Sequence, residues 1–149
     1  MPRSFDFECA PGYLMRRAQQ WAVALFMEET AGVDVTPVQF AMLHVLIAAP
    51  GTDQVTLARR VAFDEATSGS VIARLEAKGW VRREADTIDR RRKLLWATPE
   101  GEAVAQSMKR AVRRAQKRIM SPLSANEADQ LMSLLDKLVS GHEAAAARN

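Results

Sequence analysis

The chain has 149 residues, 48% of them hydrophobic and 26% charged, with a formal net charge of +3 at pH 7. Its length suits one domain of globular composition, and a single cysteine, Cys9, excludes a disulfide framework or a cysteine-rich zinc site. Residues 1–10 lack the apolar core of a signal peptide, and no apolar stretch is long enough to span a membrane. We therefore predict a cytoplasmic protein with no membrane partner.

Two predicted helices occupy the amino-terminal third of the chain. Residues 12–31 form the first, because apolar side chains recur along it at spacings of three and four. Thr36 and Gln39 make a capping box for the second, which is apolar on nearly every side through Ile47. We therefore expect the second helix to lie in the core and the first to bury one stripe.

Two short helices and a hairpin are predicted next. Thr52 is expected to cap the first of these helices, and Asp64 to cap the second, over residues 65–78. Residues 80–84 and 93–98 then have the pattern of two strands on either side of a polar loop.

The last two predicted helices begin at clear caps. Thr98 starts a long helix that ends near residue 120, and Ser124 forms a capping box with Glu127 after the helix-breaking Pro122. One face of the final helix is lined by Leu131, Leu134, Leu135 and Leu138. The predicted fold class is mainly α with a small β-hairpin, in the order α-α-α-α-β-β-α-α.

The helix over residues 65–78 has the composition of a helix that contacts DNA bases. Thr67, Ser68 and Ser70 lie near its start, and Arg74 follows one turn later. Short hydroxyl side chains let a helix backbone approach a major groove, and an arginine reaches guanine edges or phosphates. A surface helix without any ligand has the same composition, so the helix does not settle the function by itself.

The predicted hairpin is strongly basic. Residues 82–93 contain six basic and three acidic side chains, a local excess equal to the formal charge of the whole chain. The basic residues are Arg82, Arg83, Arg90, Arg91, Arg92 and Lys93. Arginines at a hairpin tip attract phosphates or enter a narrow minor groove, and Asp89 is expected to orient them by ion pairing. A solvated charged surface is the alternative, but a basic hairpin directly after two short helices favours DNA binding.

Four segments together resemble the multiple-antibiotic-resistance regulator (MarR) family. They are residues 57–61 (LARRV), 72–81 (IARLEAKGWV), 89–93 (DRRRK) and 98–101 (TPEG). The resemblance extends over nearly the whole chain, and the aspartate-arginine hairpin followed by a helix-starting threonine is its most specific part. It implies a winged helix-turn-helix fold, an obligate homodimer and binding to pseudo-palindromic duplex DNA.

The resemblance also implies how the chain is divided. Residues 1–149 form one domain, with a DNA-binding lobe at 36–100 and dimerisation helices at 12–31 and 101–141. The apolar stripes of the terminal helices are too large for the lobe to cover, which favours the dimer over a monomeric helical bundle. The implied DNA contacts are Thr67, Ser68, Ser70, Arg74, Asp89, Arg90, Arg91, Arg92 and Lys93, with Asp89 bracing the arginines.

The start of the first helix, residues 12–21, resembles a subgroup of the family that responds to aromatic acids. This implies a small organic acid effector, bound where the dimerisation helices meet the DNA-binding lobe. The candidate ligand residues are Arg16, Arg17, Gln20, Trp21, Phe40 and His44. An arginine clamps a carboxylate in bidentate fashion. The alternative is that the aromatic side chains are core and the arginines are solvated.

Other functional classes find less support. There is no nucleophile elbow, glycine-rich phosphate loop or zinc-protease motif, and the two histidines are far apart in sequence. We predict no enzymatic activity, no metal and no cofactor. The resemblance implies that a peroxide-sensing member of the family would carry its cysteine in the first helix. Cys9 precedes that helix, so redox sensing through Cys9 is disfavoured. The predicted function is a ligand-responsive regulator, in the repressor mode commoner in the family. The alternative is a winged-helix module for protein association or DNA architecture without ligand control.

Overall fold

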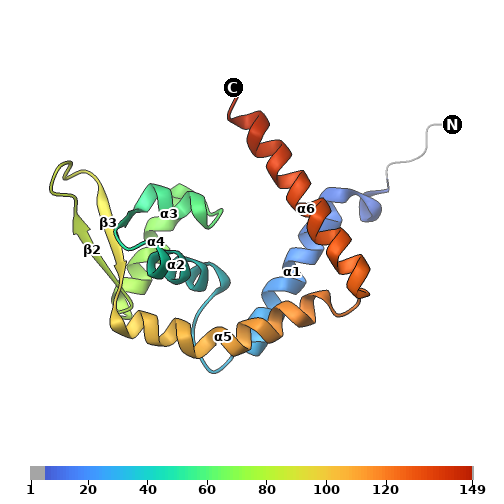
Figure 1. Cartoon of the computed structure of the whole chain (residues 1–149), viewed down its shortest axis with the longest axis horizontal. Coiled ribbons are helices and arrows are strands. Elements are labelled where there is room, and N and C mark those ends of the chain that lie inside the picture. Colours follow the sequence, from blue (N-terminus) through green and yellow to red (C-terminus); the bar gives the residue numbers. More distant parts are fainter. Residues whose placement is uncertain (1–5, 149) are drawn as a thin grey trace.

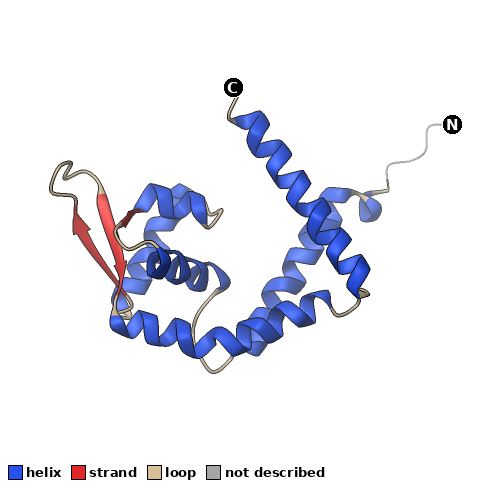
Figure 2. Cartoon of the chain, in the orientation of Figure 1, coloured by secondary structure: helices blue, strands red, loops and turns tan. Residues whose placement is uncertain are grey.

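The structure, a computed structural model, describes residues 6–148 and is mainly helical (Figure 1, Figure 2). Residues 1–5, half of the segment in which no signal peptide is predicted, and residue 149 lie outside the described residues. In chain order the elements are the 3-10 helix η1 (Phe7–Cys9), α1 (Pro11–Glu29), α2 (Pro37–Ala48), β1 (Thr52–Asp53), α3 (Gln54–Arg60), α4 (Glu65–Ala77), β2 (Val81–Ala85), β3 (Lys93–Ala97), α5 (Pro99–Met120) and α6 (Ala125–Ala146).

Figure 1 shows two parts connected by α5. Helices α2, α3 and α4 gather beside the hairpin of β2 and β3, and α5 leads from that hairpin to α1 and α6 at the other side. The predicted capping boxes at Thr36 and Ser124 are both present, and Asp64 caps α4. The predicted order of helices and hairpin is therefore confirmed, and the fold is a winged helix-turn-helix.

A third strand extends the predicted hairpin into a small antiparallel sheet of order β1-β3-β2. Thr52 and Asp53 pair with Leu95 and Leu94 of β3, so the prediction that Thr52 caps a helix is wrong. The cap is Asp53, whose Oδ1 accepts a hydrogen bond from the Thr56 amide at 3.0 Å. The Thr52 hydroxyl instead donates to the Ala49 carbonyl at 2.6 Å.

The main core lies between α2, α3, α4 and the sheet. Its fully buried members include Leu43, Leu57, Ile72, Leu75 and Leu95. Each helix contributes one apolar face, spaced as an amphipathic helix requires. Burial of this core fixes the outward orientation of the opposite face of α4.

A second, smaller core joins α1 to α5 and contains Phe26, Val35, Met108 and Ala115. Two aromatic side chains, Phe40 and Trp80, pack against both this cluster and the main core. At its edge, Arg114 and Arg118 make ion pairs with the acidic residues that end α1, Glu28 and Glu29. Hydrogen bonds from both arginines lower the pKa of Glu29.

The apolar faces of the terminal helices are largely exposed. Among the described residues of α1 only Phe26 is buried, and α6 has no buried residue. Trp21 is 59% exposed and Leu134 is 64% exposed, and further large apolar side chains are exposed along both helices. Extended apolar surface of this kind marks sites of protein contact. The single stripe expected to be buried along α1 is thus covered at one end only. Within residues 6–148, no helix has the length and apolarity needed to cross a bilayer.

Candidate nucleic-acid interface

The amino-terminal half of α4 presents small polar side chains to solvent. Asp64 accepts a hydrogen bond from the Thr67 amide at 3.1 Å, which fixes the first turn of the helix. Thr67, Ser70 and Arg74 are exposed, while Ile72 and Leu75 on the other side are buried. Arg74 makes no ion pair with any described residue, so its guanidinium is free to meet a ligand.

Ser68 does not belong to this surface. Its side chain is 1% exposed, and its hydroxyl donates to the Glu65 carbonyl at 2.8 Å. The expectation that Ser68 faces the groove is therefore corrected. It lies three residues before Val71 and four before Ile72, and so on the buried face of α4.

The wing (residues 81–97) lies against α4 and carries all six basic residues of the predicted hairpin. Arg83 on β2 makes an ion pair with Glu76 on α4, with Nε and Oε2 3.1 Å apart. Arg82 pairs with Glu84, and its guanidinium carbon lies 4.5 Å from the centroid of the Trp96 ring. The Arg83–Glu76 pair attaches the wing to α4, and the two contacts of Arg82 lie within the wing.

At the tip of the wing the basic residues differ in their partners. Asp89 accepts hydrogen bonds from the Arg91 amide at 3.1 Å and from Arg91 Nε at 3.3 Å, so the bracing ion pair expected for Asp89 is present. The Arg91 side chain is still 94% exposed. Arg90 and Lys93 are exposed and form no ion pair within residues 6–148.

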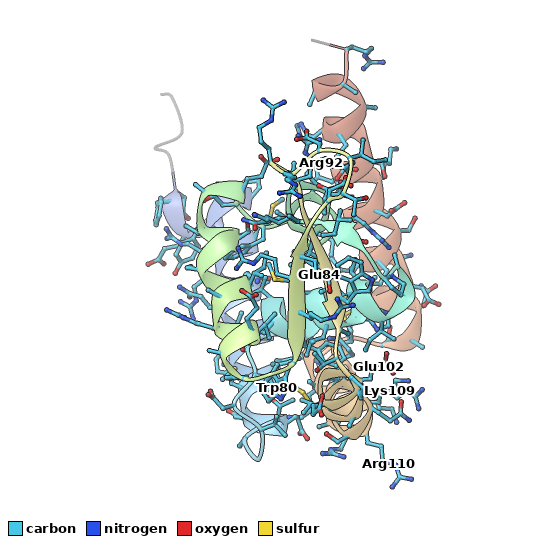
Figure 3. The ribbon with its side chains drawn as sticks, turned by 90° about the vertical axis from the view of Figure 1, so that its left-hand side faces the viewer. Trp80, Glu84, Arg92, Glu102, Lys109 and Arg110 are labelled. Carbon is cyan, nitrogen blue, oxygen red and sulfur yellow. The ribbon has the colours of Figure 1, made fainter. Side chains whose placement is uncertain are left out.

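Arg92 has a different environment from its neighbours. Its guanidinium makes two ion pairs, with Asp53 at 3.1 Å and with Asp86 at 3.3 Å. Figure 3 shows Arg92 at the end of the wing farthest from Trp80. The sequence predicted Arg92 to be a DNA contact. It did not indicate that Asp53 and Asp86 both lie within ion-pair distance of the Arg92 guanidinium.

The cap of α3 gives the chain a measurable pH dependence. Hydrogen bonding from the Thr56 amide, assisted by Thr56 Oγ1 and Arg92, lowers the pKa of Asp53 from 3.8 to about 2. A lowered pKa means that the ionised form stabilises the fold above the unfolded pKa, and that this contribution is lost as the pH falls through about 2.

We expect Asp53→Asn to cost about 1–2 kcal/mol of unfolding free energy at neutral pH, with the difference shrinking between about pH 4 and pH 2. Urea unfolding at several pH values measures it, and a constant difference contradicts the assignment.

The basic face of α5 is separate from this surface. Figure 3 shows Lys109 and Arg110 at the opposite end of the molecule from Arg92. Lys109 and Arg110 therefore do not extend the basic surface of the wing tip.

A pocket of about 470 Å³ lies between α2 and α5. It is lined by Phe40, His44, Ile47 and Ala48 of α2 and by Pro99, Glu102, Ala103, Ala105, Gln106 and Lys109 of α5. The rings of Phe40 and His44 stack with centroids 6.3 Å apart. The pocket therefore combines an aromatic wall with ionisable and amide side chains, as sites for small organic molecules do.

Only part of the predicted ligand set lines this pocket within one chain. Phe40 and His44 do, whereas Arg16, Arg17, Gln20 and Trp21 lie on α1 outside its lining. The two arginines gather around Tyr13, whose hydroxyl oxygen lies 3.2 Å from Arg17 Nη1.

Sequence reasoning missed the α5 side of the pocket. Glu102, Gln106 and Lys109 are spaced by four and three residues and so share one face of α5, and that spacing was the available signal. Figure 3 shows Glu102 and Lys109 on the same side of the helix. Among residues 6–148 there is no cluster of three or more His, Cys, Asp or Glu side chains suited to a metal.

A helix with an exposed polar face beside a braced basic hairpin defines the winged helix-turn-helix class of DNA-binding proteins. Comparisons with known proteins narrow this class. A family model described as "MarR family" matches residues 33–92. The chain is 30% identical over 139 residues to the HTH-type transcriptional repressor NicR of Pseudomonas putida, covering 93% of this chain and 88% of the relative.

Solved structures agree with the sequence relatives. Bordetella bronchiseptica BpsR, whose DNA binding is described as regulated by 6-hydroxynicotinic acid, matches with a TM-score of 0.84 and 30% identity over 91% of this chain and 96% of that one. A point mutant of MarR from E. coli, complexed with operator DNA, matches with a TM-score of 0.82 and 26% identity, over 90% and 99% of the two chains. The chain belongs to the MarR family, and it is a transcriptional regulator rather than an enzyme.

Proposed function

We propose that the protein is a homodimeric repressor that binds pseudo-palindromic duplex DNA and is released by a small organic acid of the aromatic class. The observation on which the proposal depends is the surface formed by Thr67, Ser70 and Arg74 on α4 together with Arg90 and Arg91 of the wing. The helix suits a major groove and the arginines suit phosphates or the adjacent minor groove. We propose a cytoplasmic location, which the proposed DNA binding supports.

The proposed dimer rests on the exposed apolar faces of α1 and α6. In the proposed division of the single domain, residues 36–100 bind DNA and residues 12–31 and 101–141 dimerise. A two-fold axis then places two copies of α4 about 34 Å apart, one turn of DNA. The operator complex of the related MarR mutant supports DNA as the partner.

The proposed DNA binding is tested by selecting bound fragments from genomic DNA with the purified protein at near-physiological salt. We expect one enriched, two-fold symmetric site. Salt-sensitive binding without an enriched site would contradict specific repression and favour an architectural or protein-association role, because counterion release alone gives non-specific binding.

The proposed effector site is the pocket between α2 and α5, with Phe40 and His44 as its walls. The regulation of BpsR by 6-hydroxynicotinic acid supports an aromatic acid. Arg16, Arg17, Gln20 and Trp21 stay predicted contacts. Since they do not line the pocket in one chain, a second copy would have to supply them. Effector binding is thus expected to depend on dimerisation.

We expect 6-hydroxynicotinic acid, or another hydroxylated aromatic acid, to release the protein from its selected site. Arg16→Met or Arg17→Met should raise the concentration needed for half release by about tenfold or more, because a charge-assisted hydrogen bond to the carboxylate is lost. Fluorescence anisotropy of labelled DNA measures the release, with Lys137→Met as a charge-loss control outside the pocket. Unchanged release in both arginine variants would contradict the predicted clamp.

A further inference from the structure

We propose that Arg92 is a positioning residue, which fastens the wing to the start of α3 so that Arg90 and Arg91 meet the DNA in a fixed relation to α4. This inference rests on the proposed DNA binding and assigns to Arg92 a role other than contacting DNA.

The first argument is that the Arg92 guanidinium is paired with two carboxylates at once. Nη2 lies 3.1 Å from Asp53 Oδ2, and Nη1 lies 3.3 Å from Asp86 Oδ2. The two carboxylate side chains are only 19% and 11% exposed. One guanidinium between two carboxylates makes a cluster of net negative charge. Such a cluster attracts phosphate less strongly than Arg90 and Arg91 do, although the Arg92 side chain is itself 53% exposed.

The second argument is what the bridge connects. Asp53 ends β1 and caps α3, with the Thr56 amide 3.0 Å from its Oδ1. Asp86 lies at the end of β2, and its Oδ1 accepts from the Ile88 amide in the wing loop at 3.0 Å. Arg92 therefore links the wing loop to the helix-turn-helix across a sequence separation of 39 residues.

The third argument is mechanical. Among the described residues, the wing has one other ion pair to the helices, between Arg83 on β2 and Glu76 on α4. That contact lies along the strand, whereas Arg92 lies near the tip (Figure 3). The backbone pairing of β1 with β3 fastens the wing only as far as Leu94 and Leu95. Without Arg92 the loop beyond that pairing can pivot, and the exposed arginines then lose their fixed distance from α4.

Double-mutant cycles on the duplex selected by the purified protein test this role. In the wild-type background, Arg91→Gln is expected to weaken binding about tenfold, as the loss of a charged hydrogen bond does. In the Arg92→Gln background the same change should cost only about twofold, because the tip is no longer held in place. Arg74→Gln, on α4, is the matched control and should cost the same factor in both backgrounds.

The salt dependence of binding distinguishes positioning from direct contact. Arg91→Gln should lower the slope of log K against log salt by about one unit, whereas Arg92→Gln should leave it unchanged. Asp53→Asn should reproduce the effect of Arg92→Gln, because asparagine keeps the helix cap but removes the charge. A lowered slope for Arg92→Gln, or equal costs of Arg91→Gln in both backgrounds, would overturn the inference.

Hydrogen exchange of the free protein tests the bridge without DNA. The Ile88 and Arg91 amides, which donate to Asp86 and Asp89, should exchange several-fold faster in Arg92→Gln and at the wild-type rate in Lys93→Gln. Unchanged exchange in Arg92→Gln would also overturn the inference. If the DNA selection fails but hydrogen exchange changes as expected, the proposed function is contradicted. The contacts of Arg92 with Asp53 and Asp86 are then still supported.

Discussion

Gly101→Ala is expected to lower the free energy of unfolding by about 3 kcal/mol, because the added methyl group has no room. Gly101 is buried in the first turn of α5, and a Cβ there would overlap the carbonyl oxygen of Trp80 and lie 3.0 Å from its carbonyl carbon. That carbonyl cannot move freely, since it accepts from the Thr98 amide at 3.0 Å. Either α5 or the start of the wing must shift.

Urea unfolding measures this loss, and DNA binding should fall with it because α5 and the wing meet at Trp80. Gly32→Ala is the matched control. Nothing lies within 4 Å of the Cβ it adds, so its effect should be within about 0.5 kcal/mol. Equal stability of the two variants would show that α5 approaches Trp80 less closely than described.

Leu135→Glu is expected to convert the proposed dimer into monomers and to weaken binding to the selected duplex at least about 100-fold. Leu135 is 40% exposed on the apolar face of α6, beside Leu131 and Leu138. In a two-fold interface each copy would bring a charged group into an apolar contact, which costs several kcal/mol. A monomer occupies one half-site and loses the gain of simultaneous binding.

Light scattering at micromolar concentration measures the assembly state. Ser133→Glu is the matched control, because it adds the same charge to the opposite side of α6 and should leave the dimer intact. A Leu135→Glu protein that remained dimeric would remove α6 from the proposed interface and leave α1 as the remaining candidate.

Local signals in the sequence predicted the helices well. Thr36, Asp64 and Ser124 each combine a capping side chain with the right following residues, so the information lies within one turn of the chain. The strand β1 was missed because two residues have no periodicity. Thr52 and Asp53 pair with Leu95 and Leu94, more than forty residues away.

The candidate site was predictable in part, because only those of its features that lie within one helix or hairpin leave a pattern in the sequence. Helical spacing separates the exposed Ser70 from the buried Ser68, and applying it would have excluded Ser68 beforehand. The bridge of Arg92 with Asp53 and the α5 side of the pocket depend on elements that are distant in the chain. The residue pattern of one helix or strand does not predict which side chains of a distant helix or strand will contact it.

The two aromatic side chains shared by the cores have a consequence for folding. Phe40 and Trp80 each pack against both hydrophobic clusters, so neither cluster can lose its packing while the other keeps its own intact. The DNA-reading helices and the α1–α5 contact should therefore melt in one cooperative transition. A ligand could then not regulate this chain by unfolding only the DNA-reading helices or only the α1–α5 contact. It would have to change the relative position of these two folded regions.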